Sequence, residues 1–187
     1  VIKVSDTKFA VVYNNVAGDG VNIVIGEVAG TVVTYGSEVL MKSGSTIDYA
    51  SGAYVNDDEI MVFPSADTTA YQFHVSVSVT VPTVTEGTAF ACYYKLQAVA
   101  ISATKVAVSY YQNTSTDYFL TQIFTISGTA IANGSAITLY DDTSISTANS
   151  AIRKVAEGKY VVVHQPTNNV NESAFYLMNG SVLEDKI

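Results

Sequence analysis

The chain has 187 residues, of which 48% are hydrophobic and only 14% are charged. A chain of this length and composition can bury a sizeable core, so general disorder is excluded. The net charge of −8, with nine Lys and Arg residues, argues against nucleic acid as a partner and against an anionic membrane surface, because both attract clustered cations. No stretch approaches the ~20 apolar residues of a membrane helix, so no membrane insertion is expected. Cys92 is the only cysteine, which excludes an intrachain disulfide and a thiolate metal site.

A degenerate repeat runs through the sequence. In each copy a short strand leads to a charged residue, an apolar strand and a polar loop, and the charged residues are Lys8, Glu59, Lys105 and Lys159, at steps of 51, 46 and 54 residues. A period near 50 that consists only of strands is typical of a propeller blade or a similar stacked sheet unit. We therefore expect an all-β, propeller-like array of four four-stranded antiparallel units. It forms a single repeat domain over residues 1–187, with units at about 1–48, 49–96, 97–149 and 150–187. The four units could close into one small ring or form a slice of a larger one. The alternative fold is two tandem β-sandwiches that divide near residue 96.

Four strands are expected in each unit. The short first strands are Ile2–Val4, Gly52–Val55, Ala98–Ile101 and Ala151–Val155. The second strand follows the charged residue, and its largely buried residues should be Phe9, Val11, Tyr13, Ile60, Val62, Val106, Val108, Tyr160 and Val162. No segment has a helical period with caps, and the best candidate for a short helical turn is Ser144–Ser150.

The third strands are Asn22–Val28, Tyr71–Val79, Tyr118–Ile126 and Ala174–Met178. In the second unit apolar and polar residues alternate, which places Phe73 and Val75 on a packed face and His74 on a solvent-facing one. A hairpin then leads to the fourth strand, at Ala29–Thr31, Val81–Thr83, Ser127–Thr129 and Asn179–Ser181, where Gly supplies the positive φ of the turn in three units. Three fourth strands contain a further glycine, Gly36, Gly87 or Gly134, which predicts a β-bulge or a close approach of another backbone segment.

The pattern Lys-aromatic-x-Val-x-Tyr, followed by Gly-Thr and then Gly-Ser-x-Val, is carried by Lys8–Tyr13, Gly30–Thr31 and Gly36–Val39. It recurs in a looser form at Lys105–Tyr110, Gly128–Thr129 and Gly134–Ile137. This pattern resembles the degenerate repeats of about 50 residues in virion proteins of tailed phages and in large bacterial surface proteins. The resemblance covers most of the chain and implies a structural or receptor-facing propeller. It transfers no catalytic residue.

The polar residues do not form a recognisable catalytic set. His164 lies five residues after Lys159, the position that Tyr13 and Tyr110 occupy in their own units, so we interpret it as filling an aromatic position. The acidic pairs Asp57-Asp58 and Asp141-Asp142 fall at turns, where turn chemistry explains them without a glycosidase mechanism. We therefore expect no catalytic residue, no metal ligand and no cofactor.

The loops between second and third strands carry the strongest hypothesis for ligand binding. Each follows an aromatic residue or a histidine and is rich in Asn, Thr, Asp or Gln. An aromatic ring beside amide groups suits the apolar face and the hydroxyls of a sugar. The candidate glycan-binding residues are Tyr13, Asn14, Phe63, Tyr110, Tyr111, Asn113 and His164. The competing interpretation is that the aromatic residues complete the core and the loops are simply solvated.

Taken with the repeat, these observations favour a non-enzymatic structural or attachment component of a virion or cell-surface assembly, located outside the cell or on the virion surface. Its expected partners are other structural proteins or copies of itself, and a lectin-like propeller that binds a surface glycan is the alternative. Imperfect alternation along the strands predicts exposed apolar surface around Phe90–Tyr94 and Phe119–Phe124, and such surface usually marks an interface.

Overall fold

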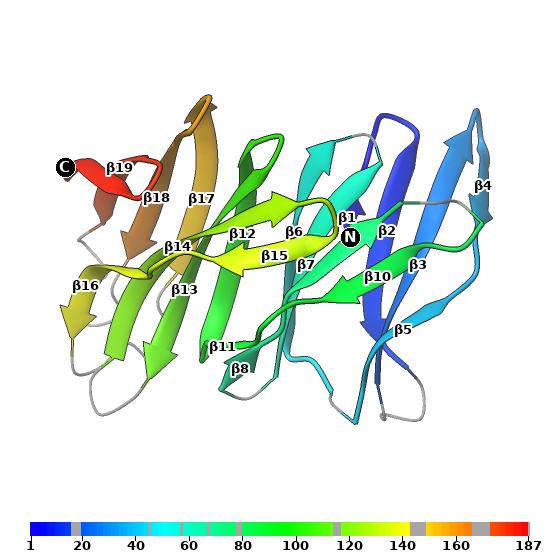
Figure 1. Ribbon diagram of the computed structural model, residues 1–187, viewed down its shortest axis with the longest axis horizontal. Coiled ribbons are helices and arrows are strands. Elements are labelled where there is room, and N and C mark those ends of the chain that lie inside the picture. The colour runs from blue at the N-terminus through cyan, green and yellow to red at the C-terminus, as the bar shows by residue number, and fades with distance from the viewer. Residues whose placement is uncertain are drawn as a thin grey trace.

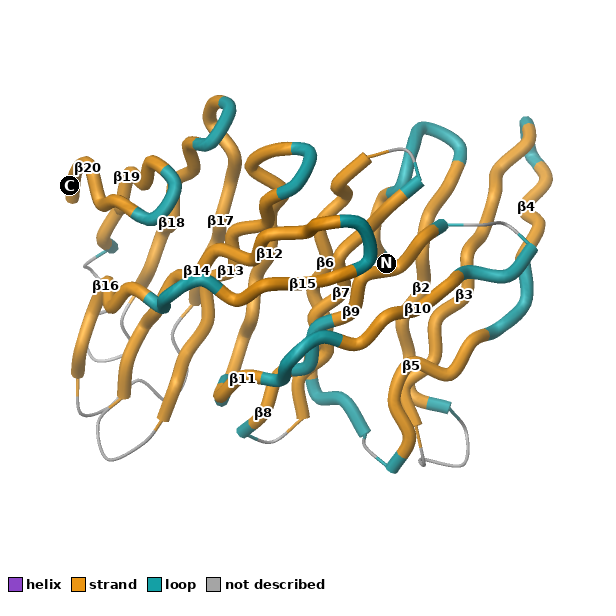
Figure 2. Tube along the Cα trace, in the orientation of Figure 1, coloured by secondary structure: helices purple, strands orange, loops and turns teal. Residues whose placement is uncertain are grey.

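The computed structural model describes residues 1–15, 20–44, 46–56, 58–66, 68–77, 80–113, 117–142, 149–165 and 173–186; the side chains at 94, 95, 113, 117, 141, 142 and 149 are not described. These ranges contain strands, turns and loops but no helix (Figure 2). The all-β prediction is confirmed. The helical turn expected at Ser144–Ser150 lies outside the described residues, except for positions 149 and 150, which belong to a strand.

The strands form four antiparallel sheets in chain order, but only the last has the expected four strands. The first three have five, six and five, because the expected fourth strand is broken at its glycine and the second sheet contains the additional short strand β8 (Thr69–Ala70). Sheet 1 contains β1 (Ile2–Lys3), β2 (Lys8–Asn14), β3 (Gly20–Ala29), β4 (Val32–Tyr35) and β5 (Val39–Ser43). Sheet 2 contains β6 (Tyr49–Asn56), β7 (Glu59–Ala66), β8 (Thr69–Ala70), β9 (Phe73–Ser76), β10 (Thr83–Glu86) and β11 (Phe90–Ala91). Sheet 3 contains β12 (Tyr94–Ser102), β13 (Lys105–Asn113), β14 (Asp117–Ser127), β15 (Ala130–Asn133) and β16 (Ile137–Asp142). Sheet 4 contains β17 (Asn149–Ala156), β18 (Lys159–Gln165), β19 (Ala174–Asn179) and β20 (Val182–Lys186).

The four sheets follow one another along the long axis of the molecule, with sheet 1 at the right end and sheet 4 at the left end of Figure 1. Their first strands contact one another in succession, β1 with β6, β6 with β12 and β12 with β17. One hydrophobic core lies between each pair of successive sheets. Because sheets 2 and 3 share a core as the other pairs do, the chain does not divide into two sandwiches. Sheets 1 and 4 lie at opposite ends, so these four sheets do not close a ring.

Stacking gives each sheet two distinct faces. We call the face toward the sheet 1 end of the stack the leading face and the opposite one the trailing face. In β7, Ile60 and Val62 lie on the leading face and pack against sheet 1. Their neighbours Met61 and Phe63 lie on the trailing face and pack against sheet 3. Successive strand residues point to opposite sides, so a sheet that is covered on both sides buries a continuous run of its central strand.

Strand β13 of sheet 3 follows the same rule. Val106 and Val108 join the core with sheet 2, whereas Ala107 and Tyr111 join the core with sheet 4. Ser109 is also buried. Continuous burial is the pattern expected for a strand that is covered on both faces. The end sheets differ, because β18 alternates between buried and partly buried residues along its whole length.

Burial of the predicted second-strand residues follows from this arrangement. Six of the nine are fully buried: Ile60, Val62, Val106, Val108, Tyr160 and Val162. The prediction is wrong for Phe9, Val11 and Tyr13, which are only partly buried. These three lie on the leading face of sheet 1, which no other sheet covers in the described part of the chain.

The prediction that His74 faces solvent is wrong, since this side chain is only 1% exposed. It pairs with Met61 across β9 and β7 and therefore lies on the trailing face of sheet 2, which sheet 3 covers. Its Nε2 is 3.5 Å from the Glu59 carboxylate. Gln72 is buried on the same side and donates from Nε2 to Asn133 Oδ1 of sheet 3 at 2.7 Å. The strand expected over Tyr71–Val79 is observed as the shorter β9, which ends at Ser76; residues 78 and 79 are not described.

The three glycine turns are present, but the turn expected at Val81–Thr83 is part of a longer connection between β9 and β10, and the fourth strands are broken, not bulged, at Gly36, Gly87 and Gly134. Gly30, Gly128 and Gly180 have φ values of 64°, 58° and 55° in the hairpins that lead to the fourth strands, a region that glycine enters without a Cβ penalty. At the other glycines the fourth strand is interrupted, and the glycine N–H donates to the third strand. The bonds are Gly36 to Ile25 O at 2.9 Å, Gly87 to Gln72 O at 2.9 Å and Gly134 to Ile123 O at 2.8 Å. These interruptions separate β4 from β5, β10 from β11 and β15 from β16.

Candidate functional site

Two of the candidate glycan-binding residues, Phe63 and Tyr110, lie in the core between sheets 2 and 3. Phe63 is fully buried and Tyr110 is 3% exposed. Their rings belong to one aromatic cluster, in which Phe63 is 5.2 Å from Phe124 and Phe90 is 5.0 Å from Tyr110 between ring centroids. Tyr110 donates its hydroxyl to Gln122 at 3.0 Å, and burial raises its pKa. Neither ring can be stacked upon by a sugar from solvent.

Tyr111 and His164 lie in the core between sheets 3 and 4. The His164 ring stacks on Phe119 at 4.5 Å between centroids and lies 5.7 Å from Tyr111 and 5.0 Å from Tyr140. The interpretation of His164 as the occupant of an aromatic position is therefore confirmed. Burial, with a smaller contribution from the positive charge of Lys186, lowers the pKa of His164 to about 4. The imidazole is thus neutral at physiological pH, and its surroundings are rings rather than substrate space.

Tyr13, Asn14 and Asn113 complete the candidate set. Tyr13 is partly buried, and burial together with a hydrogen bond to Glu38 raises its pKa. Asn14 ties two segments of its own unit together: its Nδ2 donates to Ile47 O at 3.0 Å and its Oδ1 accepts from Ile47 N–H at 2.7 Å. The Asn113 side chain lies outside the described residues. The candidate residues are therefore dispersed over two cores and one strand end, and the described ones do not form an aromatic platform.

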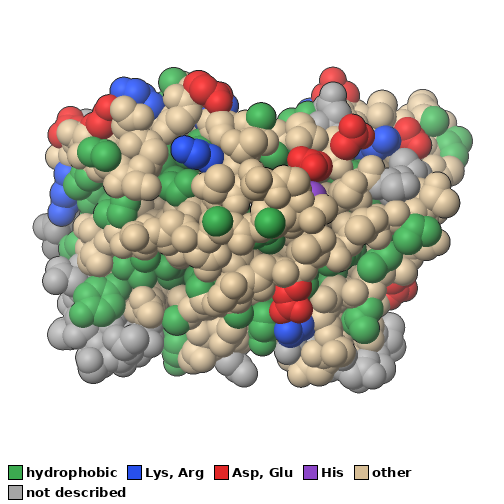
Figure 3. All heavy atoms as spheres, viewed as in Figure 1, with side chains coloured by type: hydrophobic (Ala, Val, Ile, Leu, Met, Phe, Trp, Pro, Cys, Tyr) green, Lys and Arg blue, Asp and Glu red, His purple; other side chains and the backbone are tan. Residues whose placement is uncertain are grey.

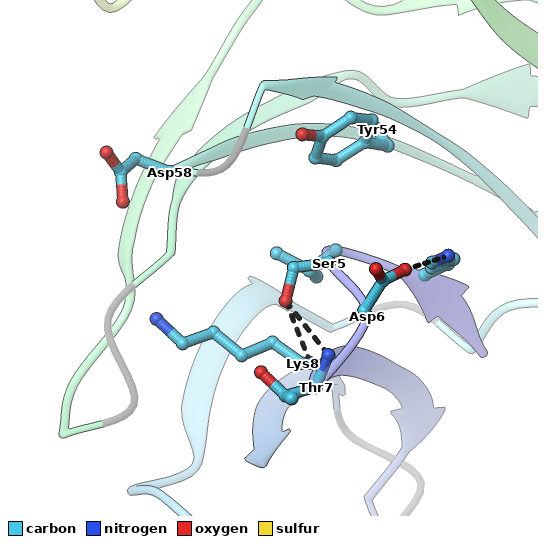
Figure 4. A pocket seen from close by; sticks show the side chains of 8 residues that line it. Ser5, Asp6, Thr7, Lys8, Tyr54 and Asp58 are labelled. Atoms are coloured by element: carbon cyan, nitrogen blue, oxygen red, sulfur yellow. Dashed lines mark hydrogen bonds and ion pairs between the residues drawn. The ribbon is translucent and has the colours of Figure 1, made fainter. Parts of the chain in front are cut away.

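An open groove of about 700 Å³ lies between the β1–β2 turn and the β6–β7 turn (Figure 4). Ser5, Asp6 and Lys8 line it, but the hydrogen bonds of Ser5 and Asp6 serve the turn. The Ser5 hydroxyl oxygen accepts from the N–H groups of Thr7 and Lys8 at 3.2 and 3.0 Å. Asp6 pairs with Lys3 at 2.8 Å, and this hydrogen bond lowers the pKa of Asp6. Tyr54 and Asp58 form the opposite wall.

Most of the side chains of the two acidic pairs lie outside the described residues, so the structure does not place the pairs. Asp57 and the side chains of Asp141 and Asp142 lie outside the described residues, and Asp58 is exposed at its turn. Within the described part of the chain, no three His, Cys, Asp or Glu side chains gather as metal ligands would. That part also contains no helix with the length and apolarity needed to cross a membrane.

Polar contacts tie each sheet to the next. Lys42 of sheet 1 pairs with Glu86 of sheet 2 at 2.6 Å. Thr121 of sheet 3 and Tyr160 of sheet 4 share a buried hydrogen bond of 3.1 Å. Together with the Gln72–Asn133 bond, these contacts link all three pairs of successive sheets. The Thr121–Tyr160 bond and the Gln72 amide are buried, where polar groups need such partners, so these two contacts help to fix how one sheet is placed on the next; the Lys42–Glu86 pair is partly exposed.

Each end of the stack carries an apolar face that no other sheet covers in the described part of the chain. Large hydrophobic side chains are also exposed away from the ends, at Tyr49, Tyr54 and Val81 of sheet 2 and its loop. On the leading face of sheet 1, Phe9 packs edge-on against Tyr35 at 6.1 Å, and Tyr35 is 62% exposed. On the trailing face of sheet 4, Val163 pairs with Phe175, which is 46% exposed. None of these four residues belongs to any of the three cores. We call these surfaces the leading end face, which contains Phe9, Val11, Val24, Tyr35 and Leu40, and the trailing end face, which contains Ala151, Val161, Val163, Phe175 and Leu177.

Sequence reasoning missed the end faces and placed the exposed apolar surface elsewhere. Phe119 and Phe124 are fully buried, which corrects the expectation for Phe119–Phe124. In Phe90–Tyr94, Phe90 packs in the aromatic cluster and Cys92 is 1% exposed. The repeat did indicate which residues share a face, because the position of a second-strand residue relative to the charged residue determines the side of the sheet to which it points. The broad side of the molecule in Figure 3 presents mostly backbone and uncharged polar side chains, with charged ones mainly along its upper edge.

Comparison of the chain with protein-family models, with curated proteins and with solved structures finds no match.

Proposed function

We propose that this protein is a non-enzymatic structural or attachment component of a virion or cell-surface assembly, and that it acts through protein–protein packing. The observation that carries the proposal is the pair of apolar end faces. The equivalent surfaces inside the molecule are buried between sheets, whereas Tyr35 and Phe175 at the ends are 62% and 46% exposed. Contiguous exposed apolar surface of this kind is characteristic of interaction sites.

We further propose that the stack is a propeller-type array that neighbouring sheets continue at both ends. Sheets that pack face to face, with their first strands β1, β6, β12 and β17 in a row, are arranged as blades are around a propeller axis. Sheets 1 and 4 lie far apart, so closure of a ring needs more sheets of the same kind. The resemblance to phage virion and bacterial surface repeats favours an extracellular or virion-surface location.

The polar residues support a role without catalysis. His74 and His164 are both buried, and the Ser5 hydroxyl is engaged by its own turn. Among the candidate glycan-binding side chains that the structure describes, only Tyr13 and Asn14 lie outside the cores, and Asn14 is bonded to the Ile47 backbone. Packing through the end faces uses apolar surface that no other sheet covers in the described part of the chain, and we therefore favour it.

The proposal is tested by locating the protein in its source. Purified particles and the cell-surface fraction are analysed by quantitative mass spectrometry and by cryo-electron microscopy. We expect a fixed number of copies per particle or per lattice unit, retained through a high-salt wash because apolar contacts are not screened by salt. Recovery of the chain only as a free protein in the soluble fraction, with none in particles or on the surface, would contradict the proposal.

A further inference from the structure

We propose that the protein associates head-to-tail with a second copy of itself, so that the trailing end face of one copy packs on the leading end face of the next. This inference rests on the proposed function and names the partner. It follows from the way in which each second strand distributes its residues between the two sides of its sheet.

Residues that lie two and four positions after the repeated charged residue point to the trailing side. In sheet 1 they are Ala10 and Val12, which pack on sheet 2. In sheet 2 they are Met61 and Phe63, which pack on sheet 3. Sheet 4 holds Val161 and Val163 at the same two positions, and both are only partly buried. The trailing end face of sheet 4 is therefore equivalent to the trailing faces of the preceding sheets, each of which packs against the next sheet.

Residues one and three positions after the charged residue point to the leading side. They are Ile60 and Val62 in sheet 2, Val106 and Val108 in sheet 3, and Tyr160 and Val162 in sheet 4, and all six are fully buried against the preceding sheet. Sheet 1 holds Phe9 and Val11 at these positions, partly buried and outside every core. The leading end face of sheet 1 is therefore equivalent to the leading faces of sheets 2, 3 and 4, each of which packs against the preceding sheet.

The two end faces are therefore the two complementary halves of a junction that the chain already makes three times. Every internal junction joins a trailing face to a leading face, and none joins two faces of the same type. A contact between copies that continues the stack has the same polarity. Such a contact is heterologous, and repeated addition gives a closed ring or an open filament, depending on the rotation between copies.

The test is sedimentation velocity of the purified chain over a wide concentration range. Val11→Glu alters only the leading end face and Val163→Glu only the trailing end face; each should weaken self-association on the order of 100-fold, because each places a carboxylate in an apolar contact. Val81→Glu is the matched control, since Val81 is 53% exposed and lies on neither end face. It should associate like the wild type.

Mixing the two end-face variants decides the polarity. Each variant alone should stay monomeric, but the intact trailing face of Val11→Glu fits the intact leading face of Val163→Glu, so their mixture should form a dimer of one copy each. If one variant is monomeric while the other still forms a dimer, the contact joins like faces, and the head-to-tail inference is wrong although packing through end faces stands. A wild-type chain that stays monomeric throughout overturns the inference and leaves the proposed function to the particle analysis.

Folding of each variant is checked by its thermal melt. If either valine variant does not fold, the more exposed Tyr35→Glu and Phe175→Glu replace them on the same two faces. These side chains lie at the surface, so the substitutions leave the three internal cores untouched. The same mixing result is expected from this second pair, and its absence would contradict the inference in the same way.

Discussion

His164 lies in the core between sheets 3 and 4, and neither of its ring nitrogens has a hydrogen-bond partner among the described residues. The Tyr111 hydroxyl and the Tyr176 hydroxyl nearby are unpartnered in the same sense, and Lys186 lies 5.4 Å from the centroid of the Tyr176 ring. A protonated imidazole in this setting would be a buried cation among rings, with a lysine close by. Such a charge is strongly disfavoured.

This environment predicts acid-dependent stability. The pKa of His164 is lowered from 6.5 to about 4 in the folded protein. Between these two values the unfolded chain binds a proton that the folded chain does not, so the free energy of unfolding falls as the pH falls from 6.5 toward 4. The loss amounts to about 3 kcal/mol. Chemical denaturation across this range should show a smaller loss for His164→Phe than for the wild type, since other groups titrate equally in both. Equal losses would show that His164 is not responsible.

Gly134 illustrates a residue that the backbone geometry requires. A Cβ at this position would lie 2.8 Å from the carbonyl oxygen of Ile123, which is the acceptor of the Gly134 N–H bond itself. The fourth strand is interrupted at this point, and the third strand passes too close for a side chain.

Gly134→Ala should therefore destabilise the protein by roughly 1–3 kcal/mol, the usual range for an atom forced into a packed site. The measurement is urea denaturation, and the neighbouring exposed residue provides the control as Ser135→Ala, which should change stability by less than about 0.5 kcal/mol. Equal effects of the two substitutions would mean that the break in the strand tolerates a side chain.

At the scale of strands, four equivalent valines provide a matched series. Val11, Val62, Val108 and Val162 each lie three residues after the repeated charged residue on the leading side of their strand. Val62, Val108 and Val162 are fully buried, whereas Val11 is only partly buried. The chemistry of a Val→Ala change is the same at all four positions, and only the presence of a preceding sheet differs.

We expect the free energy of unfolding to fall by roughly 2 kcal/mol for each of Val62→Ala, Val108→Ala and Val162→Ala, because two methyl groups leave a packed core and a cavity remains. In the dissociated chain, Val11→Ala should cost less than about half of that. Calorimetry at low protein concentration gives the comparison. A cost for Val11→Ala as large as the other three would mean that its face is covered within a single chain.

The strands also show which features of the fold could be predicted from the sequence. The hairpins at Gly30, Gly128 and Gly180 were predictable, because their backbone requirement is local, and so was a special role for Gly36, Gly87 and Gly134, although the strand is broken there and not bulged. His74 was misplaced because alternation was interpreted as one packed face and one wet face, whereas sheet 2 is covered on both. The candidate site failed for a related reason: Phe63, Tyr110 and Tyr111 lie in strands that are covered on both sides, and His164 points to the covered side of sheet 4. Nothing local in the sequence indicates which sheet is the last in a stack.

At the scale of the whole molecule, the balance between apolar surface and charge determines how assembly responds to salt. Each copy carries a net charge of −8, so two copies repel each other at low ionic strength. The end faces are apolar at their centres, and Arg153 and Asp185 lie on the trailing side of sheet 4 with opposite charges. Added salt therefore screens repulsion between copies without removing a dominant attraction between charges.

Head-to-tail association should accordingly become tighter as NaCl rises from low concentration to about 0.5 M, where the Debye length has shrunk to a few ångströms. The dissociation constant from sedimentation equilibrium should fall over this range, and sulfate should lower it further because excluded salts favour apolar burial. The Val81→Glu control should follow the same trend, with a slightly steeper response because its net charge is one unit more negative. Dissociation on adding NaCl would instead mean that ion pairs hold the copies together, and the apolar end faces would not be the contact.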